Sequence, residues 1–248
     1  MINRIYNFLP VFFQNIIVSI YGLYWRKRRF GGVFKKEVDY FKSRNNFSKK
    51  QWDKYQEEEL RKILIHAFTN VPFYKKKYTK AGFSLRDFQN FKLSNLNKLP
   101  FLEKDELRHF CKTELLASNK NKGSFYSSSG STGTPVQIYY SHLFHQRWSA
   151  VFETRIRNWA NVDRFKSRAM LGSRLVVPVN QKKPPYFRFN WFENQLYFSI
   201  NHLSKNTAKN YIESMNKFGV EYLTGYANSI WLLAKYGIDL KLDSLKLK

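Results

Sequence analysis

Apolar positions recur at helical spacing through the first third of the chain. In the first thirty residues these positions are Ile2, Ile5, Leu9, Phe12, Ile16, Ile20 and Leu23. The spacing places them on one face of a helix. A second helix is predicted from Ser48, a suitable N-cap, to Phe68, and it ends before Pro72. A short basic helix is predicted over 73–81, and residues 84–98 are expected to form a loop whose aromatic side chains contact the core.

The last hundred residues alternate between strand and helix patterns. Strands are predicted over 169–171, 175–177, 195–198 and 222–224. Helices are predicted over 142–159, 207–218 and 228–236. Ser141 and Asn206 can cap the first two, and Gly237 is expected to close the third. This alternation predicts an α/β fold in which a helix-rich N-terminal region precedes mixed sheets with flanking helices.

A hydroxyl-rich segment with two glycines occupies residues 127–135, with the sequence SSSGSTGTP. Serine and glycine runs are also typical of linkers and turns. Here, however, strand-favouring residues flank the run at 125–126 and 136–140. A strand, a glycine turn and a second strand can aim backbone N–H groups and hydroxyls at one anion, so the segment is a candidate phosphate-binding loop. It lacks the Gly-Lys-Ser/Thr ending of a Walker loop and the three-glycine dinucleotide fingerprint.

Residues 128–135 resemble the phosphate-binding signature of adenylate-forming enzymes, in the form found in phenylacetate-CoA ligases and their relatives in capsule polysaccharide biosynthesis. Further segments resemble the same family: VPFY at 71–74, LPFLEKDEL at 99–107, and YLTGYANS at 222–229 with Ala227 where proline is usual. The opening residues 9–22 resemble the capsule branch most. The resemblance implies a partial N-terminal domain of an adenylate-forming enzyme.

That resemblance implies a two-step reaction. A carboxylate attacks the α-phosphate of ATP to give an acyl-adenylate and pyrophosphate, and the acyl group then passes to an acceptor such as coenzyme A. The resemblance further implies that the reaction uses Mg²⁺. It also implies that the β- and γ-phosphates of ATP are bound by Ser128, Ser129, Gly130, Ser131, Thr132 and Gly133. Many relatives have lysine after the loop's proline, whereas Val136 stands here. A cation that neutralises phosphate must therefore come from elsewhere.

The resemblance also implies an acyl pocket near Gly225, Tyr226 and Ser229, although Tyr226 can equally serve to pack the start of a helix. The acidic Mg²⁺ motif, the ribose-binding aspartate and the C-terminal lysine of full-length relatives have no evident counterpart before Lys248. No catalytic residue and no protein metal site is predicted. Two functions stay open: the nucleotide-binding part of a carboxylate-activating ligase, or a truncated, non-catalytic nucleotide-binding or membrane-surface scaffold.

The composition of the chain gives it a strong positive charge. Lys and Arg total 43 against 18 acidic residues, a net charge of +25, which favours anionic partners. Nucleic acid is disfavoured because no nucleic-acid-binding module organises the charge. The single cysteine, Cys111, excludes an internal disulfide and suits a reducing compartment.

The first segment adds a candidate contact with membranes. Residues 8–25 are mostly apolar and are followed by the basic run 26–29. A core-packing or dimer helix, an interfacial anchor and a membrane-spanning helix all stay open, in that order of preference. We expect a helical, membrane-interfacial segment over 1–47 and the adenylate-forming domain over 48–248, in a cytoplasmic protein that is peripheral at the inner face of the membrane.

Overall fold

The computed structural model describes residues 2–128, 130, 133 and 135–242. The chain divides into two compact units. The first unit comprises Met1–Gly31 with Val151–Lys248, and the second comprises Gly32–Ala150. The expected division at residues 47 and 48 differs from these bounds and stays a prediction about family domains.

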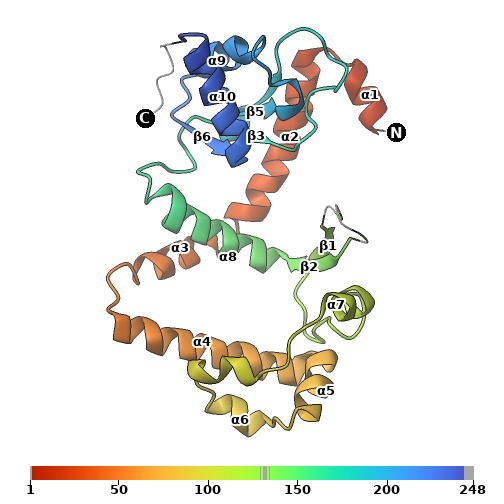
Figure 1. Cartoon of the computed structure of the whole chain (residues 1–248), viewed down its shortest axis with the longest axis vertical. Helices are drawn as coiled ribbons and strands as arrows, with labels where there is room; N and C mark the ends of the chain where they lie inside the picture. Colours follow the sequence, from red (N-terminus) through yellow and green to blue (C-terminus); the bar gives the residue numbers. More distant parts are fainter. Residues whose placement is uncertain (1, 129, 131–132, 134, 243–248) are drawn as a thin grey trace. The chain divides into compact units, whose positions relative to one another are not determined.

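The first unit is built on a four-stranded sheet (Figure 1). Its strands are β3 (Arg168–Gly172), β4 (Phe187–Asn190), β5 (Gln195–Ser199) and β6 (Tyr222–Gly225), in the order β4-β5-β3-β6. Strand β3 runs parallel to both β5 and β6, whereas β4 is antiparallel to β5. The sheet is therefore mixed, and β4 forms one edge.

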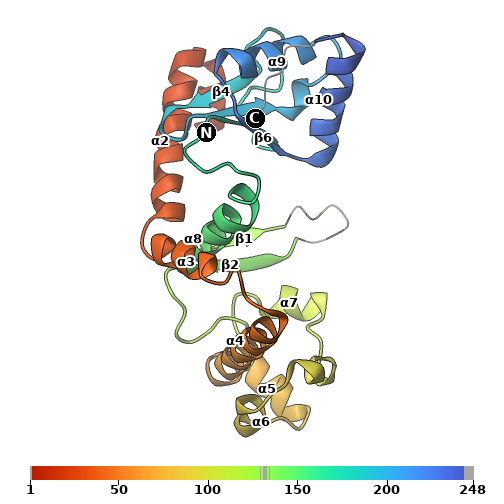
Figure 2. The ribbon, with the colours of Figure 1, turned by 90° about the vertical axis from the view of Figure 1, so that its left-hand side faces the viewer.

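Helices cover both faces of this sheet (Figure 2). Helices α9 (Ala208–Lys217) and α10 (Ala227–Asp239) bury their apolar sides on one face, where Leu171, Leu196 and Phe198 are at most 1% exposed. Helix α2 packs along β4 on the other face. Alternation of side chains along each strand explains the two packed faces, because successive residues point to opposite sides. Two short 3₁₀ helices, Trp191–Glu193 and Ile200–His202, follow β4 and β5.

The N-terminal segment forms two helices, α1 (Ile2–Phe8) and α2 (Val11–Phe30), separated at Pro10. The side-chain amide of Gln14 donates to the carbonyls of Tyr6 and Leu9 and so holds the break. Helix α2 packs on the protein, but not through the predicted apolar stripe. Phe12 and Ile20 of that stripe are 60% and 62% exposed.

The second unit is helix-rich. Its elements up to the hairpin are α3 (Phe34–Lys42), α4 (Lys49–Asn70), α5 (Pro72–Lys80), α6 (Leu85–Gln89), the 3₁₀ helix Leu93–Lys98 and α7 (Lys104–Phe110). Ser48 caps α4 as predicted, in a capping box with Gln51. The loop predicted over 84–98 was wrong because Ser84 and Asp87 form another capping box, which starts α6. The aromatic contacts predicted there are confirmed, since Phe88 is fully buried.

A two-stranded antiparallel hairpin follows, made of β1 (Gly123–Ser127) and β2 (Gln137–Ser141). Helix α8 (His142–Phe152) begins directly after it, and the Ser141 hydroxyl accepts from the N–H of Phe144 as predicted. A π-helical turn, Glu153–Arg157, ends the helix earlier than expected. Phe144 and Trp148 of the helix are 46% and 54% exposed, and Trp159, after the π turn, is 84% exposed.

Three other predictions in the first unit need correction. Residues 175–177 form no strand, because the N–H of Val176 donates to the carbonyl of Arg174 at 2.9 Å and so closes a tight turn. The Val176 carbonyl accepts from the Tyr6 hydroxyl at 2.6 Å. Strand β4 was missed. Gly237 does not close α10 but lies buried within it, where a Cβ would stand 3.2 Å from the Cδ1 of Ile212.

The fold class is nevertheless the predicted one: an α/β chain whose helix-rich N-terminal region precedes its sheets. Among the residues that the structure describes, no helix combines the length and the hydropathy needed to cross a membrane.

Candidate functional site

The β1–β2 hairpin carries the predicted phosphate-binding loop. The strand ladder extends to the pair Ser127 and Gln137. Beyond it, the N–H of Ser128 donates to the carbonyl of Val136 at 2.9 Å, and the N–H of Val136 donates to the Ser128 hydroxyl oxygen at 3.0 Å. Two strands therefore clamp the loop at its base, which confirms the predicted strand-turn-strand arrangement and excludes a simple linker.

Two glycines shape the part of the loop that the structure describes. Gly130 has φ +62°, in the left-handed region, and a Cβ there would stand 2.7 Å from the Cγ of Pro135 and 2.8 Å from the carbonyl oxygen of Gly133. Gly133 has φ +148°, and its N–H donates to the Gly130 carbonyl at 3.2 Å. Only glycine fits position 130 without displacing its neighbours.

Of the six predicted phosphate-binding residues, three can be placed. Ser128, Gly130 and Gly133 lie together at the hairpin end, and the Ser128 oxygen is engaged by Val136. The other three, Ser129, Ser131 and Thr132, lie outside the described residues.

A cavity of about 420 Å³ lies beside this hairpin. Its lining combines basic side chains from α7 and the turn after it with residues of the two strand ends: Arg108, His109, Cys111, Lys112, Ser127, Pro135 and Gln137. The Nη2 atom of Arg108 stands 3.6 Å from the point that a Cβ on Gly133 would occupy. Cations thus lie next to the loop although Val136 replaces the usual lysine. The sequence did not predict these cations, because nothing in the spacing of Arg108 and Lys112 links them to the loop that begins at residue 127.

Helix α7 is held in place by contacts with α5. Lys77 forms an ion pair with Glu106, and the rings of Phe73 and Phe110 lie 5.3 Å apart. The hydrogen bond from Lys77, aided by the N–H of Glu103, lowers the pKa of Glu106 below its ordinary value. These contacts fix the helix that presents the basic side chains to the cavity.

Within that arrangement, the guanidinium of Arg108 has two terminal nitrogens with different surroundings. Its Nη1 donates to a carboxylate oxygen of Asp105 at 2.7 Å. Its Nη2 is the atom beside Gly133. Cys111 is half-buried and lines the same cavity.

The residues predicted for the acyl pocket lie at the carboxyl end of the parallel strands, in the first unit. The N–H of Tyr226 donates to the carbonyl of Leu171 at 3.0 Å, and its hydroxyl donates to the Ser173 oxygen at 3.0 Å. A Cβ on Gly225 would clash with the same Leu171 carbonyl. Tyr226 also accepts from the N–H of Ser229 at 3.0 Å, and its side chain is 54% exposed. The structure therefore brings all three residues to one strand end, the usual place for ligands in parallel sheets.

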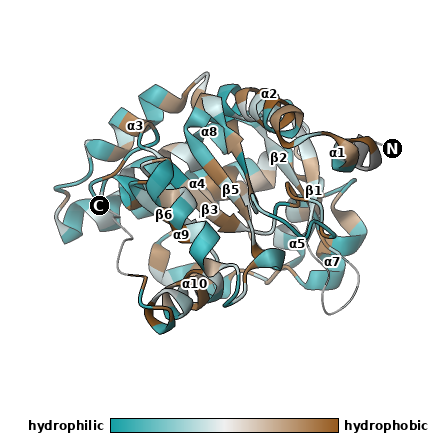
Figure 3. Cartoon of the chain, turned by 90° about the horizontal axis from the view of Figure 1, so that it is seen from above, coloured by the Kyte–Doolittle hydropathy of each residue, from teal (hydrophilic) through white to brown (hydrophobic). Residues whose placement is uncertain are grey.

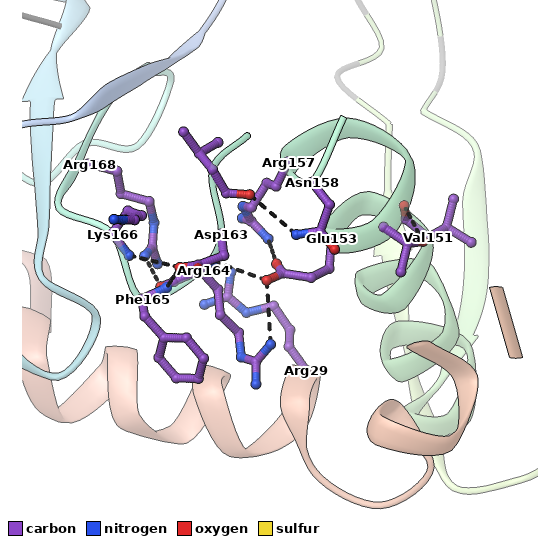
Figure 4. Close-up of polar contacts among 12 residues, drawn as sticks. Arg29, Val151, Glu153, Arg157, Asn158, Asp163, Arg164, Phe165, Lys166 and Arg168 are labelled. Carbon is purple, nitrogen blue, oxygen red and sulfur yellow. Dashed lines mark hydrogen bonds and ion pairs between the residues drawn. The ribbon is translucent and has the colours of Figure 1, made fainter. Parts of the chain in front are cut away.

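Two buried carboxylates elsewhere in the first unit are structural. Glu153, 3% exposed, accepts from Arg157 at 2.9 Å and from the backbone N–H of Arg164 at 3.1 Å (Figure 4). Glu193, 5% exposed, pairs with Arg29 and Arg168 at 2.5 and 3.5 Å. Because each carboxylate is enclosed by arginines, neither offers a free base to a substrate.

A metal-binding cluster was not predicted within this chain. Across 2–128, 130, 133 and 135–242, no three His, Cys, Asp or Glu side chains are placed to hold a metal ion together.

Several known proteins are similar to this chain in sequence. The chain is 28% identical to Protein CapK of Staphylococcus aureus over 243 residues. This match covers 98% of this chain and 52% of CapK. The chain is 33% identical over 119 residues to phenylacetate-coenzyme A ligase of Escherichia coli, covering 48% of this chain and 24% of that enzyme. The Thermus thermophilus ligase of the same name is 31% identical over 87 residues, covering 35% of this chain and 19% of that enzyme. No family model matches the chain.

The chain is therefore a relative of CapK and of the phenylacetate-CoA ligases, as its motifs predicted. The chain spans about half the length of CapK and about a quarter or less of the ligases.

Proposed function

We propose that this chain is the N-terminal, nucleotide-binding part of an ATP-dependent carboxylate-activating ligase. In the reaction, a carboxylate oxygen of the substrate bonds to the α-phosphorus of ATP. The bond between that phosphorus and the bridging oxygen breaks, and pyrophosphate leaves with the electron pair. The acyl-adenylate then transfers its acyl group to an acceptor, for which coenzyme A is the proposed thiol.

One observation carries this proposal: basic side chains line a cavity beside a glycine and hydroxyl loop that two strands clamp. A triphosphate needs both parts, because backbone N–H groups and hydroxyls orient its oxygens while cations offset its charge. Arg108 and Lys112 are the proposed cations, acting on the β- and γ-phosphates. Negative charge builds up on the β- and γ-phosphates as pyrophosphate leaves. Arg108 and Lys112 would stabilise that charge and so favour the chemical step.

The remaining parts of the proposal follow the family resemblance. Ser128 to Gly133 form the phosphate grip, and Gly225, Tyr226 and Ser229 contribute to the acyl pocket. Mg²⁺ is proposed to enter with the nucleotide. We further propose a cytoplasmic protein that serves capsular or surface polysaccharide biosynthesis, on the strength of the similarity to CapK.

Calorimetric titration with ATP and with AMP tests the site. The double variant Arg108→Gln, Lys112→Gln is expected to bind ATP about 10-fold or more weakly, because a hydrogen bond to a charged group contributes about 1.5–3 kcal/mol. Binding of AMP, which lacks the β- and γ-phosphates, should change little. Lys80→Gln is the matched control, since Lys80 is an exposed lysine of α5 in the same unit. Gly133→Val should also obstruct approach of the triphosphate.

Each outcome decides between functions. Absence of ATP binding by the wild-type chain would refute the nucleotide site. If the double variant loses equal affinity for ATP and for AMP, Arg108 and Lys112 do not act on the β- and γ-phosphates. That result would not refute the nucleotide site itself. Pyrophosphate release that depends on an added carboxylate supports the ligase. ATP binding without any such release, in the full-length protein, favours the non-catalytic scaffold.

A further inference from the structure

Helix α2 reverses the usual orientation of an amphipathic helix. Gln14 and Ser19 are only 2% and 1% exposed, and they face the sheet edge. Gln14 accepts from the buried guanidinium of Arg188, and Ser19 accepts from the N–H of Trp191 at 3.1 Å. Gly22 is also buried, against strand β4. The side of α2 that packs on the protein is therefore largely polar and small.

The opposite side of α2 is apolar and exposed. Phe12, Phe13, Ile17, Ile20 and Tyr24 recur at steps of one, three or four residues, which places them on one broad face of the helix. Their exposed fractions run from 41% to 62%. Phe8, at the end of α1, is 89% exposed. We call these six residues the apolar helix surface. Hydrophobic colouring alternates with hydrophilic colouring on α1 and on the adjoining part of α2 (Figure 3).

Charge indicates what this surface can contact. No acidic residue precedes Glu37 in the chain. Arg26 and Lys27, near the C-terminal end of α2, are both exposed. Tyr21 and Tyr24 precede them on the same helix, with exposed fractions of 54% and 55%. On a helix that lies in the plane of an anionic lipid interface, apolar side chains can enter the acyl-chain boundary while tyrosines and basic side chains contact the headgroups.

We propose that the apolar helix surface docks on an anionic lipid surface, with α2 lying in the plane of the interface. A one-sided contact follows from the packing, because β4 occupies the other side of α2 through Gln14, Ser19 and Gly22. The positive charge of the whole chain, +25, increases attraction to such a surface. This inference does not depend on nucleotide binding.

Sedimentation with vesicles tests the proposal. The chain is expected to bind vesicles of phosphatidylcholine mixed with phosphatidylserine, more weakly those of phosphatidylcholine alone, and to lose affinity as salt rises. The double variant Phe12→Ser, Ile20→Ser should weaken binding to the mixed vesicles at least 10-fold. Its matched control is Phe101→Ser, Ile63→Ser, because Phe101 and Ile63 are 79% and 64% exposed in the second unit. Unchanged circular dichroism in both variants shows that any loss is not unfolding.

Three results would overturn the proposal. The first is a wild-type chain that stays in the supernatant with mixed vesicles at low salt. The second is an equal loss of binding in the control variant. The third is a dimer in light scattering that Phe12→Ser, Ile20→Ser abolishes while vesicle binding is absent, which would assign the surface to a second copy of the chain.

Discussion

The hydroxyl oxygen of Ser19, on helix α2, accepts a hydrogen bond from the backbone N–H of Trp191 at 3.1 Å. One turn earlier, the side-chain oxygen of Asn15 accepts from the N–H of Phe189 at 3.0 Å. Phe189 lies in β4, the edge strand of the sheet, and Trp191 follows directly after it. Side chains of a helix thus satisfy backbone donors that an adjacent strand would otherwise satisfy, which protects the edge from pairing with another chain.

Ser19→Ala is expected to destabilise the protein by about 1–3 kcal/mol, because it leaves the buried N–H of Trp191 without an acceptor. Chemical denaturation of the two proteins measures the difference. Ser43→Ala is the control, since Ser43 is exposed at the end of α3. Equal stability of Ser19→Ala and wild type would show that this hydrogen bond contributes nothing.

Gly130→Ala should weaken ATP binding and lower the global stability by no more than about 1–2 kcal/mol. The left-handed backbone at Gly130 disfavours alanine by about 1–2 kcal/mol, and the new Cβ would press on Pro135. The hairpin end therefore has to change shape. Calorimetry gives the ATP affinity and thermal unfolding gives the stability. Gly219→Ala is a matched control, because Gly219 has φ +56° and open space around its Cβ position.

The ion pair between Glu106 and Lys77 should make stability depend on acid. The folded-state pKa of Glu106 is lowered from 4.5 by this hydrogen bond, so its contribution is complete above pH 4.5 and is lost as pH falls through the lowered value. Glu106→Gln should therefore be less stable than wild type at neutral pH, with the difference shrinking below pH 4.5. Denaturation midpoints measured across pH 2–7 test this. A difference that stays constant across that range would contradict it, and Glu58→Gln, on an exposed helix pair, is the control.

The elements that were predicted well are those with strong local signals. Ser48 caps α4 with its own hydroxyl, and Pro72 begins α5, so both boundaries depend on residues close in sequence. The loop at 127–135 was found for the same reason, since its glycines and hydroxyls are contiguous. Strand β4 was missed because it gains its place from pairing with β5 and from α2, both of which are tertiary contacts.

The errors at α2 and at the site have a common physical cause. An apolar stripe normally faces the core, yet the polar Gln14 and Ser19 are the buried residues, because a strand edge needs hydrogen-bond partners. Likewise, Arg108 and Lys112 lie beside the hairpin because the ion pair between Lys77 of α5 and Glu106 of α7 holds α7 in place. Neither arrangement leaves a signal in local spacing.

Phe88 is the centre of the core of the second unit and should be the most sensitive position there. It is fully buried, and its ring centroid lies 5.0 Å from that of Tyr78 and 5.6 Å from those of Phe68 and Phe83. Phe88→Ala should lower the free energy of unfolding by about 3–5 kcal/mol, because it removes a buried ring and leaves a cavity.

The control for this prediction is Phe101→Ala, since Phe101 is 79% exposed in the same unit. That change should lie within about 0.5 kcal/mol of wild type. Chemical denaturation followed by circular dichroism reports both variants, because α4, α5 and α6 surround Phe88 and their helical signal is lost when this core unfolds. If Phe88→Ala were no more destabilising than Phe101→Ala, the aromatic cluster would not be what stabilises these helices. A large effect at Phe88 alone would locate the stability of the helical unit in that cluster and not in its surface ion pairs, which contribute about 0–1 kcal/mol each.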